Sequence, residues 1–196
     1  EKFLHRPIVN EYVEILWFCI KSLWPDCIRR KKTFRTLVSH DVDNPFEHAS
    51  SGFYRMSRSM VGDLLKRKDL KSFCNRPFEW FKVNYKDIKY DPKNTFDFIM
   101  DSSEKYNIRS TFNFISDHSN SERDGIYSIS DLNILNLLKK IHNRGHLIGL
   151  HGSFDSYDNY VQLEKEFNIL KETCNEIGIK QKIWGTRQHY LRFKIP

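Results

Sequence analysis

Alternating strand-like and helix-like stretches limit most strongly what this chain can fold into. Short apolar stretches of strand length occur at residues 34–40, 109–115, 146–150 and 181–185. Stretches with apolar residues at helical spacing separate them, at 94–106, 131–145 and 157–177. Parallel strands need long crossover connections, and these are most often helices. The pattern therefore predicts an α/β fold with a parallel sheet.

Two further segments precede the regular part of this pattern. Residues 8–24 have apolar side chains at helical spacing, so we expect a helix within an N-terminal extension over 1–32. Residues 44–93 contain a plausible helix near 57–67 and no clear strand. We interpret that segment as an insertion after the first strand. Otherwise we expect residues 1–196 to belong to one domain.

The chain is basic, with a formal net charge of +7 and a pI of about 9.2. A basic balance favours acidic partners, such as nucleic acid, anionic glycans or nucleotide sugars. The densest basic run is Arg29, Arg30, Lys31 and Lys32, which we interpret as a solvated connector. Because no nucleic-acid recognition motif accompanies the charge, we expect no nucleic-acid partner.

Cysteine usage and hydropathy indicate a compartment and exclude a membrane span. The four cysteines form no C-x-x-C pair, and we expect Cys19 and Cys174 to be buried thiols of helices. The longest strongly apolar run, Ile15 to Ile20, is far shorter than the roughly 20 residues needed to cross a bilayer. With no signal peptide visible, we expect a cytoplasmic protein.

Reactive side chains gather near the carboxyl ends of three predicted strands. Asp41 and Asp43 follow the first strand, and His151 follows the third. A third cluster, Arg187, His189 and Tyr190, follows the fourth strand. Carboxyl ends of parallel strands lie at the same edge of a sheet, so these clusters are predicted to converge.

The residue types suit a metal site with a nearby base. Of Asp41 and Asp43, one carboxylate can bind a cation while the other stays free as a base. His151 and Asp155 are four residues apart, so a helical turn after the strand would bring both to one point. Imidazole and carboxylate ligands favour Zn²⁺, with Co²⁺ or another divalent ion as alternatives. A guanidinium such as that of Arg187 can hold a carboxylate and keep it ionised.

The same clusters also have interpretations that involve no catalysis or metal binding. The stretch from Ser39 to Pro45 contains Asp, Asn and Pro, which favour turns. The stretch from Gly185 to Arg192 can be a charged surface loop. His146 stands at the start of its predicted strand, away from the site, and we interpret it as structural.

Four short motifs resemble the NodB-like polysaccharide deacetylases of carbohydrate esterase family 4. They are SHDVD at 39–43, STFNFI at 110–115, GHLIGLH at 145–151 and GTRQHY at 185–190. The resemblance runs from about Phe34 to the C-terminus and is strongest to a bacterial branch associated with O-antigen and capsule biosynthesis. It implies a distorted (β/α) barrel and a metal-dependent carbohydrate N-deacetylase.

The resemblance also implies roles for individual residues. Asp41 would be the catalytic base, while Asp43 and His151 would bind the metal. Arg187 would orient Asp41, and the backbone N–H of Tyr190 would face the oxyanion. These roles are expectations that follow from the motifs alone.

The chain departs from the family pattern in two places. Asp155 stands where the family has a second metal histidine, so we expect it to be the third metal ligand. The chain reaches Pro196 before the two later family motifs, one of which supplies the general acid. We therefore expect a barrel that is incomplete in this chain, and His189 is the candidate substitute acid.

We expect hydrolysis of an N-acetyl group on a carbohydrate, with an N-acetylated saccharide or glycan as substrate. One alternative is a catalytically impaired deacetylase-like module that binds glycans. Another is a different metal-dependent hydrolase such as a phosphoesterase, because Asp-x-Asp with histidine suits that chemistry too. A nucleic-acid binder ranks third, and the sequence defines neither the sugar nor the oligomeric state.

Overall fold

The structure is a computed structural model, and it describes residues 4–30, 33–49 and 52–194. Internal contacts divide the chain into two units, Glu1–Arg35 and Thr36–Pro196. Each unit is described by itself. The predicted domain boundaries stay predictions.

The first unit contains one helix, α1 (Ile8–Leu23), as its sequence predicts. None of the helix residues is buried. The prediction that Cys19 is a core thiol is therefore wrong, since Cys19 is exposed. Beyond the helix, Arg29 forms a 2.6 Å ion pair with Glu14. Residues 31–32 of the predicted connector lie outside the described residues. Neither α1 nor any other described helix has the length and apolar character needed to cross a membrane.

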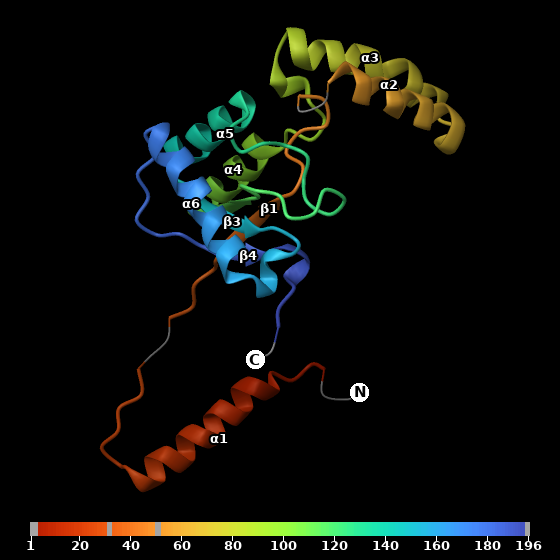
Figure 1. The fold of residues 1–196 in the computed structure, drawn as a ribbon. Helices are drawn as coiled ribbons and strands as arrows, with labels where there is room; N and C mark the ends of the chain where they lie inside the picture. Colours follow the sequence, from red (N-terminus) through yellow and green to blue (C-terminus); the bar gives the residue numbers. More distant parts are fainter. Residues whose placement is uncertain (1–3, 31–32, 50–51, 195–196) are drawn as a thin grey trace. The chain divides into compact units, whose positions relative to one another are not determined.

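The second unit is built on a parallel sheet of four strands in the order β1-β2-β3-β4. The strands are β1 (Val38–Val42), β2 (Ser110–Phe114), β3 (Leu147–Gly152) and β4 (Thr186–Gln188). They form a half-barrel with helices around it (Figure 1). The predicted class, an α/β fold with an incomplete NodB-like barrel, is confirmed.

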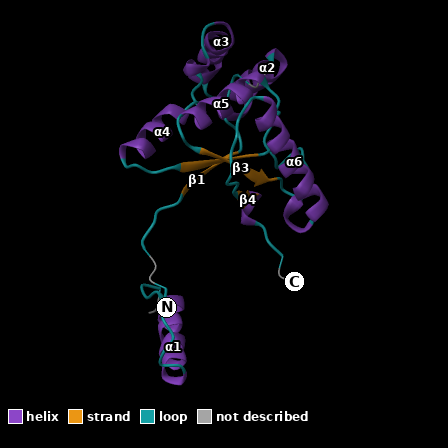
Figure 2. Cartoon of the chain, turned by 90° about the vertical axis from the view of Figure 1, so that its left-hand side faces the viewer, coloured by secondary structure: helices purple, strands orange, loops and turns teal. Residues whose placement is uncertain are grey.

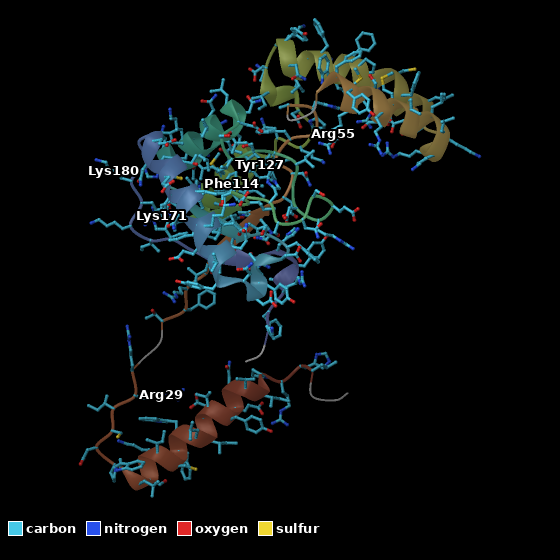
Figure 3. All side chains as sticks on the ribbon, in the orientation of Figure 1. Arg29, Arg55, Phe114, Tyr127, Lys171 and Lys180 are labelled. Carbon is cyan, nitrogen blue, oxygen red and sulfur yellow. The ribbon has the colours of Figure 1, made fainter. Side chains whose placement is uncertain are left out.

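Figure 1 shows helices crossing between successive strands, and Figure 2 shows them packed around the sheet. The crossover helices are α4 (Phe96–Lys105), α5 (Leu132–Asn143) and α6 (Tyr160–Glu176). The core contains Phe112, Phe114, Ile148 and Leu150, and Figure 3 shows Phe114 inside the unit. Each such side chain stabilises the fold by about 1.5–3 kcal/mol. Cys174 is buried in this core, as predicted.

The first strand begins later than its sequence predicts. Residues 34–40 are the predicted strand, but pairing with β2 runs from Val38 to Val42. Phe34 and Leu37, two of its predicted apolar positions, are 94% and 78% exposed. As a result, Asp41 lies within the strand and not after it.

The fourth strand is also displaced, from the predicted 181–185 to Thr186–Gln188. The side chain of Gln181 explains the difference. Its amide accepts a hydrogen bond from the Ile148 N–H at 2.9 Å and donates to the Ile148 carbonyl at 2.7 Å. Because this side chain occupies the edge of β3, backbone pairing with β3 begins only at Gly185.

Residues 44–93 contain more helix than predicted. Their elements are α2 (Phe53–Gly62), the π-helical turn η1 (Asp63–Arg67), α3 (Leu70–Tyr85) and the short 3-10 helix η2 (Ile88–Tyr90). The described residues, 44–49 and 52–93, form no strand, as predicted. Helix α3 was not predicted, because Pro77 interrupts its sequence pattern. Its start is capped by Asp69, which accepts a hydrogen bond from the Ser72 N–H at 3.0 Å.

A buried carboxylate joins α2, η1 and α3. Asp63 forms an ion pair with Arg76 of α3 at 2.7 Å and another with Arg67. Arg76 also lies 3.3 Å from Glu47, in the segment that follows β1. The Arg76 guanidinium, with help from Arg67, lowers the pKa of Asp63. Ion pairs of Arg76 therefore connect the helical hairpin formed by α2, η1 and α3 to Glu47, which follows β1.

We expect Asp63→Asn to destabilise the hairpin by about 3 kcal/mol near neutral pH, because Arg76 loses its buried partner. The lowered pKa of Asp63 means that its charge stabilises the fold above about pH 4. That contribution is lost as the pH falls through the lowered pKa, so the free energies of unfolding of variant and wild type converge in acid. Urea unfolding followed by circular dichroism, from neutral pH down to acid, measures both free energies.

The control for this prediction is Asp87→Asn, which changes a more exposed carboxylate in the same segment. Asparagine can still accept the hydrogen bond from the Lys89 N–H, so stability should change little. Equal unfolding midpoints for Asp63→Asn and wild type at neutral pH would contradict the role given to Asp63.

Candidate functional site

The two faces of the sheet differ in chemistry. Successive strand residues point to opposite faces. The register aligns Asp41 with Asn113, Asn113 with Gly149, and His151 with Arg187. The apolar core residues of β2 and β3 alternate with these positions and face the helices. The polar residues therefore share the other face, which places Asp41, His151 and Arg187 together as predicted.

Asp41 is held on both carboxylate oxygens. Arg187 Nε lies 3.0 Å from Oδ2 in an ion pair. The side-chain amide of Asn113 donates a hydrogen bond to Oδ1 at 3.0 Å. Both contacts fix the orientation of the carboxylate. The structure thus brings Asp41 and Arg187 together, in the pairing that the sequence predicts.

Asn113 is a site residue that the sequence reasoning missed. It is 2% exposed and lies between apolar residues of β2. Gly149 on β3 leaves room for it, because a Cβ at that position would collide with the Asn113 side-chain oxygen. A polar residue inside an otherwise apolar strand was the available signal. Its partner, 72 residues away, was not visible in the sequence.

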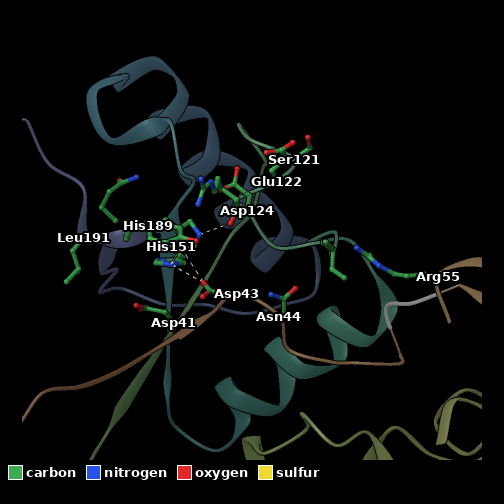
Figure 4. A pocket seen from close by; sticks show the side chains of 14 residues that line it. Asp41, Asp43, Asn44, Arg55, Ser121, Glu122, Asp124, His151, His189 and Leu191 are labelled. Carbon is green, nitrogen blue, oxygen red and sulfur yellow. Dashed lines mark hydrogen bonds and ion pairs between the residues drawn. The ribbon is translucent and has the colours of Figure 1, made fainter. Parts of the chain in front are cut away.

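A second cluster combines Asp43, His151 and His189. Oδ1 of Asp43 lies 3.2 Å from Nε2 of His151 and 3.5 Å from Nδ1 of His189. The two ring nitrogens are 2.9 Å apart. Figure 4 shows the three side chains pointing toward one another. These are the ligand types that a divalent cation takes, and the three atoms lie within 4.8 Å of one another.

Each imidazole has an inner nitrogen, which faces Asp43, and an outer nitrogen, which faces away from it. The hydrogen bond of the outer nitrogen determines which ring nitrogen carries the proton. His151 Nδ1 lies 2.8 Å from the Arg187 carbonyl oxygen, and His189 Nε2 lies 2.9 Å from that of Arg123. A carbonyl only accepts, so each of these outer nitrogens carries the proton. In neutral rings the two inner nitrogens then present lone pairs to each other and to Asp43.

This arrangement fits a cation. Oδ1 of Asp43 is buried and has no hydrogen-bond partner among the described residues. The neighbouring ring of His151 lowers the pKa of the Asp43 carboxyl. Burial opposes a charge on His151, but Asp43 and the Arg187 carbonyl outweigh it and raise the pKa of His151. Three electron-rich atoms at one point repel one another unless a positive charge lies among them.

Asp155 lies outside this cluster. Its carboxylate is 3.3 Å from Arg192 Nη1 and accepts a hydrogen bond from Asn120 at 3.3 Å. The spacing argument required a helical turn to start after His151, but β3 continues through Gly152. Because the strand runs past His151 and the next helical turn, η3 (Ser156–Asp158), begins only after Asp155, no helical turn aligns the two side chains. The geometry gives Asp155 a different set of partners.

His189 and Tyr190 lie in a turn, η4 (His189–Leu191), with unusual backbone angles. Tyr190 and Leu191 have φ values of 56° and 53°. The left-handed conformation costs about 1–2 kcal/mol per non-glycine residue, and such strain is typical of functional sites. The turn buries His189 and leaves Tyr190 60% exposed. The Tyr190 ring packs against Phe154 at 5.4 Å.

A pocket of about 590 Å³ opens over both clusters. Its lining includes Asp41, Asp43, His151 and His189, together with Arg55 from α2 and Arg123 from the loop after β2. The same loop passes close to the site at Gly125, where a Cβ would collide with the Asp43 carbonyl. The pocket can hold a small polar group against the metal-ligand cluster and the paired carboxylate.

Comparison with known proteins gives one match. The family model described as polysaccharide deacetylase matches residues 78–195, more than half of the chain. The matched part includes His151 and His189 and begins after β1, which carries Asp41. No curated protein and no solved structure matches the chain. The chain thus belongs to the polysaccharide deacetylase family, whose activity is removal of acetyl groups from carbohydrate.

Proposed function

We propose that the protein hydrolyses the N-acetyl amide of a carbohydrate in a metal-dependent reaction. The observation that carries the proposal is the division of labour between two neighbouring carboxylates. Asp43 faces two imidazoles, whereas Asp41 is held apart by Arg187 and Asn113. One carboxylate can thus bind a cation while the other remains a free base.

The proposed metal ligands are Asp43, His151 and His189. One carboxylate and two imidazoles suit Zn²⁺, and Co²⁺ can take the same ligands. When bound, the ion would activate water and polarise the acetyl carbonyl. His189 replaces Asp155 in this proposal, because its ring nitrogen faces the cluster and the Asp155 carboxylate faces Arg192. His189 is then a ligand and not the substitute acid.

Asp41 is the proposed base, taking a proton from the attacking water. Arg187 and Asn113 hold its two oxygens, so the carboxylate keeps a fixed orientation. The backbone N–H of Tyr190 is the proposed donor to the oxyanion that forms on the acetyl group. The left-handed turn at Tyr190 supports this role, since strained backbone is common where donors must be aimed.

The proposed substrate is an N-acetylated sugar within a glycan. The motif likeness to the O-antigen and capsule branch motivates a bacterial surface polysaccharide as its source. The family match does not distinguish this branch from others.

We expect the protein to bind one Zn²⁺ near neutral pH and to lose it on Asp43→Ala, His151→Ala or His189→Ala. Each change removes one of the converging ligand atoms. Removing one ligand from such a site should weaken metal affinity at least about 10- to 100-fold. Metal analysis after dialysis, together with calorimetric titration of Zn²⁺, measures the stoichiometry and the affinity.

Asp155→Ala is the matched control for the metal site. Because Asp155 binds Arg192 and Asn120, this variant should still hold its ion. Loss of the ion from Asp155→Ala with retention by His189→Ala would reverse the choice between these two ligands. A wild-type protein with no stoichiometric metal would favour the glycan-binding alternative over the enzyme.

We expect Asp41→Asn to lower kcat by about 100-fold or more, because the amide cannot accept the proton. Metal binding should persist, since Asp41 is outside the ligand cluster. Acetate release from N-acetylated oligosaccharides measures the loss, with Asp158→Asn as a control at a remote carboxylate. Full activity of Asp41→Asn would remove Asp41 as the base. Phosphate release from a phosphorylated sugar, without acetate release from the oligosaccharides, would favour the phosphoesterase alternative.

We expect Gly149→Ala to lower kcat about tenfold or more, because the new Cβ displaces Asn113 from beneath Asp41. KM and metal binding should stay close to wild type. Gly185→Ala is the control, since a Cβ there meets nothing within 4 Å. Unchanged kcat in Gly149→Ala would show that Asn113 does not position the carboxylate.

A further inference from the structure

A second hollow lies beside the site, along one side of α2 and η1. Its volume is about 820 Å³. Its lining repeats at helical spacing and consists of Tyr54, Arg55, Arg58, Ser59, Val61, Gly62, Leu65, Lys66 and Arg67. We call it the basic groove. It is not part of the metal-ligand cluster or of the Asp41 pair.

The groove carries an excess of positive charge. Arg67 is paired with Asp63, a carboxylate that is buried and also bound by Arg76. Within the described part of the chain, Arg55, Arg58 and Lys66 form no ion pair. Cations that line one groove without acidic partners attract an anionic ligand and give a neutral ligand no such attraction.

Apolar side chains lie among these cations. Tyr54 is 79% exposed, Leu65 71% and Val61 54%. Sugar rings present apolar C–H faces that pack on aromatic and aliphatic surfaces, while acidic sugars add carboxylates. The mixture of a tyrosine with guanidinium and ammonium groups therefore suits a chain of acidic sugars better than an isolated inorganic anion.

The groove is continuous with the candidate active site. Arg55 lines both the basic groove and the pocket that contains Asp43 and His151. Arg55 belongs to α2, and Figure 4 shows its side chain pointing toward that pocket. Arg123 adds a second guanidinium to the lining of the same pocket. A ligand that enters the pocket can thus extend onto the groove without leaving the surface.

We propose that the basic groove binds the carboxylate-bearing sugars that neighbour the reacting N-acetyl sugar in an anionic glycan. The inference rests on the proposed function and narrows its substrate class from N-acetylated glycans to acidic ones. Continuity with the pocket favours a glycan over a membrane surface, because a flat lipid surface cannot reach the buried ligand cluster. Arg58 and Lys66 contact the acidic sugars, and Arg55 bridges the two sites.

The test compares two probes of equal length by calorimetry. One is a hexasaccharide of alternating glucuronate and N-acetylglucosamine, and the other is the neutral hexamer of N-acetylglucosamine. We expect the acidic probe to bind more tightly to wild type, with an affinity that falls as salt rises. In Arg58→Ala/Lys66→Ala, affinity for the acidic probe should fall about fivefold, while the neutral probe is unaffected.

Lys71→Ala/Lys82→Ala is the matched control, because it removes two exposed cations from α3, outside the groove. It should behave as wild type toward both probes. Equal affinity for the two probes, or an equal loss in both double variants, overturns the proposal. Binding of the groove to phosphatidylserine vesicles without preference for the acidic glycan overturns it in favour of a lipid surface.

Acetate release separates this inference from the proposed function. Preference for the acidic probe with no acetate released from either probe supports the groove while the hydrolytic function fails. Acetate release from both probes with the same KM, unchanged in Arg58→Ala/Lys66→Ala, supports the function while the groove fails.

Discussion

Two backbone carbonyls determine the chemistry of this site. The carbonyls of Arg187 and Arg123 each fix the proton on the outer nitrogen of one imidazole. When the rings are neutral, the inner nitrogens of His151 and His189 present lone pairs toward Asp43. This constraint accounts for a buried carboxylate oxygen that has no hydrogen bond within the described residues, and it keeps Asp43 distinct from Asp41, whose partners are a guanidinium and an amide.

Parallel topology is the reason that much of this could be predicted from the sequence. Alternating strands and helices predict a parallel sheet, and the carboxyl ends of its strands then bring Asp41 and Arg187 into one region. The convergence of Asp43 with His151 follows from the same rule. Asp43 and His151, 108 positions apart, and Asp41 and Arg187, 146 positions apart, thus meet without any need to predict side-chain contacts in detail.

The features that could not be predicted depend on where strands end and on side chains that make hydrogen bonds in place of backbone groups. Gln181 takes the place of backbone pairing beside Ile148, so β4 starts later than its apolar pattern suggests. Strand β3 extends through His151, and the side chain that lies with Asp43 and His151 is that of His189, not that of Asp155. Asn113 was missed because its function depends on a distant partner and on the space left by Gly149.

Asp155 contacts the chain that follows η4 and not the metal-ligand cluster. Its carboxylate holds Arg192, whose guanidinium lies 4.0 Å from the Phe154 ring centre and 3.8 Å from that of Tyr157. Arg192 also donates a hydrogen bond to the Phe154 carbonyl at 2.7 Å. These contacts hold Arg192, the residue directly after the left-handed residues 190 and 191. A carboxylate at the motif position where the resemblance places a histidine can thus bind a neighbouring arginine, while the converging imidazoles come from two other positions.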